Sequence, residues 1–337
     1  MRHSLAAAAG PVLALSALIT VLVTAFAWPT AQVGPHNLPV GITGPAPAVE
    51  HIRHSLETVG DSSIDASTYR DRAAAVQAIE DRDIYGAIVV SATGPEILTA
   101  SAASPAVAQA LGAMARELPS ASPGAPAPSP GAEPVLTDVV ATPDADPHGA
   151  VFGLSLIPMV IGGLLTGAAL SLLPLGRATR IGAALAVACI TGFSVTAVLQ
   201  PWLGVLTGNY LAATAVVAMA VAAISLSLIG LFTVLGVPGL GIGAAVLIPL
   251  GIPLSGAMSA PELLPAGWGT LGTLLPPGAA VTALRSTAYF AGAGSAAALI
   301  TLGCWAAGGL LLAAAPRRMT SARRNTASET QAVAQAA

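Results

Sequence analysis

The chain has 337 residues, of which 54% are hydrophobic and only 9% are charged. Soluble domains usually carry about 25% charged residues, so most of this chain cannot face water. The formal net charge of −3 argues against a nucleic-acid partner, and the absence of lysine excludes a G-x-x-x-x-G-K-[ST] phosphate loop, so any ATP must be held by another chain.

The charges are unevenly distributed along the chain. Fourteen of the sixteen acidic residues lie between positions 49 and 146, and only Glu262 and Glu329 lie beyond position 147. This distribution predicts an α-helical integral membrane protein that carries one soluble insert. The bias toward Arg, Ala, Gly and Pro indicates a GC-rich bacterial genome, which makes the bacterial plasma membrane the expected location.

Six apolar stretches qualify, or nearly qualify, as membrane-spanning helices, which need about 20 residues. They lie at 5–27, 151–173, 181–199, 210–235, 240–258 and 291–315. The fifth is the weakest because Pro249 and Pro253 interrupt it. None contains Asp, Glu, Arg or His, which argues against ion or proton coupling. Cys189 and Cys304 fall inside two of these stretches, and we expect both to be buried as small apolar side chains.

The first stretch has two interpretations. Its basic start and its end at Ala27 are compatible with a cleaved signal peptide, which would leave Trp28 as the new N-terminus. However, its apolar core of 23 residues (5–27) is longer than the 7–15 typical of signal peptides. We therefore favour a retained transmembrane anchor at 1–28.

The placement of arginine predicts the orientation. Arg2 precedes the first stretch, Arg177 and Arg180 lie in a short turn, and four further arginines follow the last stretch within 317–324. With six spans, all of these fall on one side, which the positive-inside rule makes cytoplasmic. Both termini are then cytoplasmic and residues 29–149 are extracytoplasmic.

The extracytoplasmic segment 29–118 is expected to form a small α/β domain. Residues 38–44 have the pattern of a strand. Val49, Ile52 and Leu56 follow at helical spacing and predict a helix with one buried face.

A second helix is predicted after a capping-box pattern at Thr68 and Asp71, with Ala75, Val76 and Ile79 facing inward.

The rest of the insert alternates between strands and a helix. Residues 83–92 read as a buried strand with which 96–101 can pair, and Ser104 caps a third helix that runs to about 118. Residues 119–134 form a Pro/Ala/Ser linker. The segment 135–149 then returns toward the membrane and begins with a possible strand.

Catalytic or metal chemistry has little support in the sequence. His51 and His54 lie beside Glu50 and Glu57 at a spacing that metal ligands can use, but a solvated helix face explains them as well. There is no G-x-S-x-G nucleophile elbow. We expect no enzyme activity, no cofactor and no metal site.

The outer segment 259–290, which precedes the last span, is too polar to cross a bilayer. Pro276, Pro277 and Gly278 break any preceding helix, and an amphipathic helix follows with Arg285 and Tyr289 on its polar side. It can be a surface loop that rests on lipid, with Arg285 snorkelling to the headgroups, or a re-entrant lid at the mouth of a pathway. The five named residues are the candidate pathway-mouth element.

The order of these features resembles the membrane subunits of type-2 ABC exporters, and within them the phage infection protein (Pip) branch. The resemblance covers nearly the whole chain and rests on LPVGITG, DRDIYGAIVV, VLTDVVATPDADPHG and LLPPGAAVTALRSTAYFAGAG. It implies a permease-like bundle at 150–315 followed by a cytoplasmic tail at 316–337. It also implies a homodimer that works with a separate ATPase subunit. Small residues at Gly163 and Gly167, or at Gly239 and Gly243, would allow close helix contact.

Two functions follow from these observations. The first is an export permease that moves an apolar or amphipathic substrate across the membrane. The alternative is a non-transporting surface or scaffold protein whose outside domain binds a phage, a cell-wall component or a secretion component.

Overall fold

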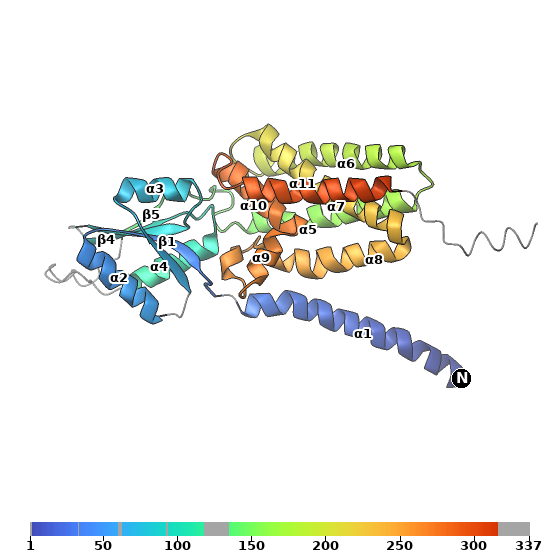
Figure 1. Cartoon of the computed structure of the whole chain (residues 1–337), viewed down its shortest axis with the longest axis horizontal. Helices are drawn as coiled ribbons and strands as arrows, with labels where there is room; N and C mark the ends of the chain where they lie inside the picture. Colours follow the sequence, from blue (N-terminus) through green and yellow to red (C-terminus); the bar gives the residue numbers. More distant parts are fainter. Residues whose placement is uncertain (1, 33, 60–62, 92–93, 118–134, 316–337) are drawn as a thin grey trace, which may run out of the picture.

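The computed structural model describes residues 2–32, 34–59, 63–91, 94–117 and 135–315. A small α/β domain lies at one end of the molecule, and a bundle of apolar helices makes up the rest (Figure 1). The predicted linker 119–134 and tail 316–337 fall outside the described residues. The chain therefore has the expected character of an α-helical membrane protein with a soluble insert.

The domain is built on one mixed five-stranded sheet in the order β2-β1-β3-β4-β5. β1 pairs in parallel with β2 and β3, β3 pairs antiparallel with β4, and β4 pairs in parallel with β5. Ile42 of β1 stands opposite Ile88 of β3, so β-branched side chains form the middle of the sheet. The strands are β1 (Leu38–Thr43), β2 (Ile64–Thr68), β3 (Gly86–Ser91), β4 (Gly94–Thr99) and β5 (Val135–Asp138).

Helices cover both faces of this sheet (Figure 1). α2 (Ala46–Val59) and α4 (Pro105–Glu117) bury apolar residues against one face, and α3 (Arg72–Glu80) covers the other. The predicted strands at 38–44, 83–92 and 96–101, the three helices and the return strand are all present. β2 was not predicted, because its short alternating pattern at the sheet edge offers only Ile64 and Ala66 to the core.

The predicted N-terminal cap of α3 was wrong. Thr68 ends β2 and pairs with Ile42, so it is not at the helix start. Asp71 is the N-cap, and its Oδ1 accepts the backbone N–H of Ala74 at 2.8 Å.

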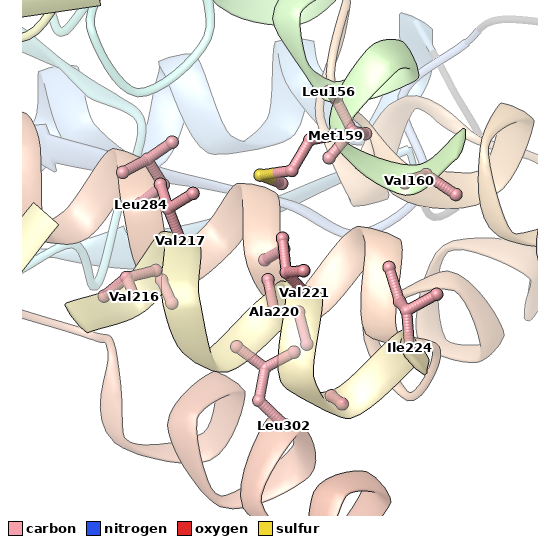
Figure 2. Packing of buried hydrophobic residues seen from close by; sticks show 14 of the residues in the cluster. Leu156, Met159, Val160, Val216, Val217, Ala220, Val221, Ile224, Leu284 and Leu302 are labelled. Carbon is pink, nitrogen blue, oxygen red and sulfur yellow. The ribbon is translucent and has the colours of Figure 1, made fainter. Parts of the chain in front are cut away.

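Four helices of the bundle are long and apolar enough to cross a membrane. α7 lies at their centre, with 72% of its most apolar stretch buried, compared with 44% for α5 and 22% for α6 and α11. Ile224 of α7 lies on the side of Val160 of α5, and Val217 of α7 lies beside Leu284 (Figure 2). The four are α5 (Ala150–Leu172), α6 (Arg177–Ala197, extended by η1, Val198–Trp202), α7 (Tyr210–Leu235) and α11 (Ala296–Ala314).

The other two predicted spans are not confirmed as full spans. The first lies in α1 (Arg2–Ala31), which includes the apolar stretch Ser16–Pro29. The fifth lies in α8 (Val237–Val246) and its extension η2 (Leu247–Gly251), where the apolar helix ends. Pro253 begins a separate 3-10 turn, η3 (Pro253–Ser255), so a proline does end the helix.

The glycines that were expected to allow close helix contact do lie at such contacts. A Cβ on Gly163 would be 2.9 Å from Ile224, and one on Gly167 would be 2.9 Å from the carbonyl oxygen of Ser225. Gly239 and Gly243 of α8 approach α7 in the same way. α5 and α8 therefore touch α7 at backbone distance.

The two cysteines are not buried as expected. Cys189 on α6 and Cys304 on α11 are both free and exposed at the surface of the protein. Neither contributes to the packing of the bundle core.

Arg177 and Arg180 lie at the start of α6, at the end of the bundle opposite the sheet domain (Figure 1). Arg177 Nη1 donates to the Ala314 carbonyl at 3.3 Å, and Arg180 Nη2 donates to the Leu173 carbonyl at 3.3 Å. The two arginines thus donate hydrogen bonds to carbonyl groups at the C-terminal ends of α11 and α5. The start of α1 lies at the same end of the molecule.

Candidate functional site

The segment that separates α8 from α11 folds at the domain end of the bundle (Figure 1). It contains η4 (Pro261–Leu263), α9 (Trp268–Thr273) and α10 (Pro276–Tyr289). Pro276 and Pro277 form the first turn of α10, where a missing N–H costs nothing. Gly278 lies so close to the Gly272 carbonyl that a Cβ would be 2.2 Å from its oxygen. Only glycine fits at this turn.

α10 does not rest on lipid. Among the candidate pathway-mouth residues Pro276, Pro277, Gly278 and Arg285 are buried, and Tyr289 is partly buried. Arg285 is 4% exposed, which does not fit the alternative in which it snorkels to the headgroups. The apolar side of α10, with Val281 and Leu284, packs into the bundle core, while its polar side meets the sheet domain. The amphipathic pattern of α10 therefore reflects contact with the bundle on one side and with the sheet domain on the other, and not contact with lipid.

Arg285 and Tyr289 are both tied to the bundle. Arg285 Nη2 donates to the Ala257 carbonyl at 3.1 Å, and its guanidinium lies 5.1 Å from the ring centroid of Phe152 on α5. The Tyr289 hydroxyl donates to the Val205 carbonyl at 2.8 Å.

The sheet domain contributes a second arginine to this place. Arg82 follows α3 in a left-handed conformation, with φ of 65°. Its Nη1 donates to the Thr282 carbonyl at 3.3 Å and to the Ser286 hydroxyl, both on α10. Its guanidinium lies 5.2 Å from the ring centroid of Phe290. Burial lowers the pKa of Arg82, although the nearby Tyr85 and Glu262 oppose that shift.

Glu262 on η4 links the bundle to the domain from the other side. The Tyr85 hydroxyl donates to Glu262 Oε2 at 2.7 Å, and the backbone N–H of His36 donates to the Glu262 carbonyl at 2.8 Å. Burial, and then the Glu262 carboxylate, raise the pKa of Tyr85, which keeps this hydroxyl a donor. Its neighbour Leu263 is buried in the core of the domain. Domain and bundle are therefore joined by both apolar and polar contacts.

These residues surround a cavity of about 260 Å³ at the junction. Arg82 and Tyr85 line it from the domain, and Glu262, Thr282 and Arg285 line it from the bundle. A second cavity of about 530 Å³ continues from it, and Pro261, Glu262 and Thr273 line both.

Sequence reasoning found only the α10 half of this site. Arg82 and Tyr85 were missed because they lie far from α10 in the sequence, and Glu262, although it lies in the same outer segment, was not connected with them. One signal was available: Glu262 is the single acidic residue between position 147 and Glu329. A lone carboxylate in an otherwise uncharged segment needs a partner if it is buried.

His51 and His54 are exposed on α2. Within the described residues, no group of three or more His, Cys, Asp or Glu is arranged to hold a metal ion.

Comparisons with protein-family models, with curated proteins and with solved structures found no match for this chain. The resemblance to type-2 exporters therefore rests on the sequence pattern, and the functions that it implies remain proposals.

Proposed function

We propose that this chain is the membrane subunit of an exporter of the type-2 ABC class. Two copies would move an apolar or amphipathic substrate across the bacterial plasma membrane, driven by a separate ATPase. The observation that carries the proposal is the buried α10, held between the sheet domain and the bundle next to a polar cavity. It lies just before the last long helix, where the sequence pattern offers a pathway-mouth element as one of two interpretations.

In this proposal all six apolar stretches cross the membrane. α1 has 30 residues and is about 45 Å long, which is enough for a 30 Å hydrocarbon core. The stretch Val237–Gly251 has 15 residues and reaches only about 22 Å. The segment of η3, η4 and α9 would complete its path, because irregular backbone is tolerated at membrane depth when protein surrounds it.

Tryptophans support a membrane boundary at the domain end of the bundle. Trp28 of α1 stacks edge-on against Trp268 of α9, with ring centroids 5.4 Å apart, at the domain end of the bundle. Trp202, which follows α6, is 76% exposed. Tryptophan concentrates where lipid headgroups begin. With Arg177 and Arg180 at the opposite end, both termini would be cytoplasmic and residues 29–149 extracytoplasmic.

A substrate pathway through a single copy would need a rearrangement. The centre of the bundle is filled by α7 and its apolar neighbours (Figure 2), whereas the two cavities lie at the domain junction. The exposed apolar faces of α5, α6 and α11 are available to lipid or to a second copy. We therefore place the pathway between two copies, with α10 at its outer mouth.

Affinity purification from native bacterial membranes after mild crosslinking tests this proposal. We expect a dimer together with a nucleotide-binding protein, and ATP hydrolysis by the complex that exceeds that of the ATPase alone. Repeated recovery of the chain without any nucleotide-binding protein, from membranes in which the dimer is captured, would contradict the proposal.

One observation favours the alternative of a non-transporting surface protein. At the end of the bundle opposite the domain, α5 and α6 are joined by residues 173–176, and α7 and α8 by Gly236 alone. Within the described residues, these turns offer little surface for an ATPase. If the purified complex contains cell-envelope proteins in place of an ATPase, the anchored binding protein becomes the better account.

A further inference from the structure

The cavity at the domain junction holds an excess of buried positive charge. Arg285 is almost fully buried, Arg82 is partly buried, and Glu262 is the one carboxylate of the lining that faces them. Asp83 also lines the cavity, but its side chain is exposed. The ion pairs recorded within the described residues lie elsewhere, at Arg53–Glu50, Arg70–Asp71 and Arg72–Glu96.

The two guanidinium groups also have donors left over. Within the part of the chain that the structure describes, Arg285 donates through Nη2 alone, and Arg82 donates through Nη1 alone. A guanidinium carries five N–H donors. Burying charges without an opposite charge is unfavourable, and like charges at short range add to the cost. α10 lies outside the candidate membrane spans. Burial, and then the charge of Arg82, lower the pKa of Arg285 to about 10, so it remains protonated at neutral pH.

We propose that this cavity binds the phosphate group of an anionic ligand between Arg82 and Arg285. The planar guanidinium fork matches phosphate oxygens in a bidentate arrangement, which a point charge does not achieve. The volume of about 260 Å³ exceeds the roughly 30 Å³ of one water molecule severalfold, so a phosphate group fits.

A second cavity and an aromatic pair lie next to the arginine cavity. The second cavity is lined by His36, Asn37 and Thr270, and it shares Glu262 with the arginine cavity as a lining residue. Trp268, which begins the neighbouring helix α9, packs against Trp28 of α1. The phosphate can therefore belong to a lipid headgroup or to a free ion, and both sources share the same chemistry. The site is defined by equilibrium binding, so it does not depend on whether the protein transports anything.

Binding to the purified full-length protein in phospholipid-free detergent tests the proposal. The probes are inorganic phosphate and a short-chain phosphatidylglycerol, with the uncharged diacylglycerol of the same chain length as the control, and calorimetry gives each Kd. We expect saturable binding of at least one phosphate probe and none of diacylglycerol. Arg285→Gln should weaken binding by about tenfold or more. Arg177→Gln, at the other end of the bundle, should leave the Kd unchanged.

Because Arg285→Gln can also disturb folding, Glu262→Gln supplies a prediction of opposite sign. The amide oxygen can still accept from Tyr85, while the negative charge that competes with phosphate is gone, so affinity should rise by about threefold or more. Tight binding of both phosphate probes indicates a free-ion site, and binding of phosphatidylglycerol alone indicates a headgroup site. Either result supports the proposal. Failure of both probes to bind the folded wild type, or a Glu262→Gln variant with unchanged or weaker affinity, overturns it.

Discussion

α7 and α10 are both buried inside this protein, but for different reasons. α7 is apolar on all sides and is enclosed by α5, α6, α8, α10 and α11. α10 is half polar, and it is buried because the sheet domain covers the side that carries Thr282 and Ser286. The composition of α7 is therefore enough to predict that it is buried, whereas the burial of α10 depends on residues that are distant in the sequence. Four substitutions sharpen this contrast, from the largest expected effect to the smallest.

The largest effect is expected where α11 touches α7. A Cβ on Gly309 would be 2.5 Å from the backbone nitrogen of Ser227, so Gly309→Leu cannot be accommodated without separating the helices. We expect a loss of about 3 kcal/mol or more in the free energy of unfolding, measured in detergent. Gly308→Leu is the matched control, because a Cβ there has no neighbour within 4 Å. Equal effects of the two changes would contradict the close contact.

The apolar side of α10 should respond almost as strongly. Leu284 is 5% exposed and packs near Val217 of α7 (Figure 2). Leu284→Ala should lower the free energy of unfolding by about 2–4 kcal/mol through the cavity that it leaves. Leu271→Ala, on the 40% exposed side chain of α9, should cost far less. If Leu284→Ala were as mild as Leu271→Ala, α10 would lie at the surface, as in the lipid-resting alternative.

The polar link between the domain and the bundle should give an intermediate effect. Tyr85→Phe removes the donor to Glu262 and leaves the carboxylate without that partner, at a cost of about 1–3 kcal/mol. Tyr210→Phe removes an exposed hydrogen bond to the Phe193 carbonyl and serves as the control. Thermal unfolding should show a lower midpoint temperature for Tyr85→Phe than for Tyr210→Phe. The reverse order would contradict the role of the junction.

The smallest effect is expected at an exposed ion pair within the domain. Arg72 Nη2 lies 2.8 Å from Glu96 Oε1, but the Arg72 side chain is 49% exposed. Arg72→Gln should cost about 0.2–1 kcal/mol at neutral pH. The Arg72 hydrogen bond holds the pKa of Glu96 below 4.5, so this stabilisation is complete above pH 4.5 and disappears as the pH falls through the folded-state pKa. Denaturant unfolding of wild type and variant between pH 7 and pH 3 should show the two curves converging. Arg70→Gln, at a more exposed pair, should show no measurable difference at any pH.

How much of the structure could be predicted from the sequence depended on whether the signal was local. The spacing of Val49, Ile52 and Leu56 predicted α2, and the β-branched run at 83–92 predicted β3, because one buried face is enough to set each pattern. Pro253 correctly marked the end of a helix. β2 escaped because an edge strand buries few side chains and so leaves a weak pattern.

The candidate site could be predicted only by half, and its surroundings were misread. An amphipathic helix next to apolar spans has the same sequence pattern whether lipid headgroups or another domain lies on its polar side. Arg285 was accordingly assigned to the interface, although its neighbours are Ala257 and Phe152. Its approach to Arg82 bridges about 200 positions of the chain, a distance over which periodicity carries no information.

The account depends most on the sheet domain lying outside the cell and the Arg177 end of the bundle lying inside. Single-cysteine labelling with a membrane-impermeant maleimide in intact cells tests this directly, after replacement of Cys189 and Cys304 by alanine. Ala113→Cys on α4 should react in intact cells, and Ala178→Cys at the start of α6 should react only after permeabilisation. Labelling of Ala178→Cys in intact cells, with Ala113→Cys protected, would contradict the account.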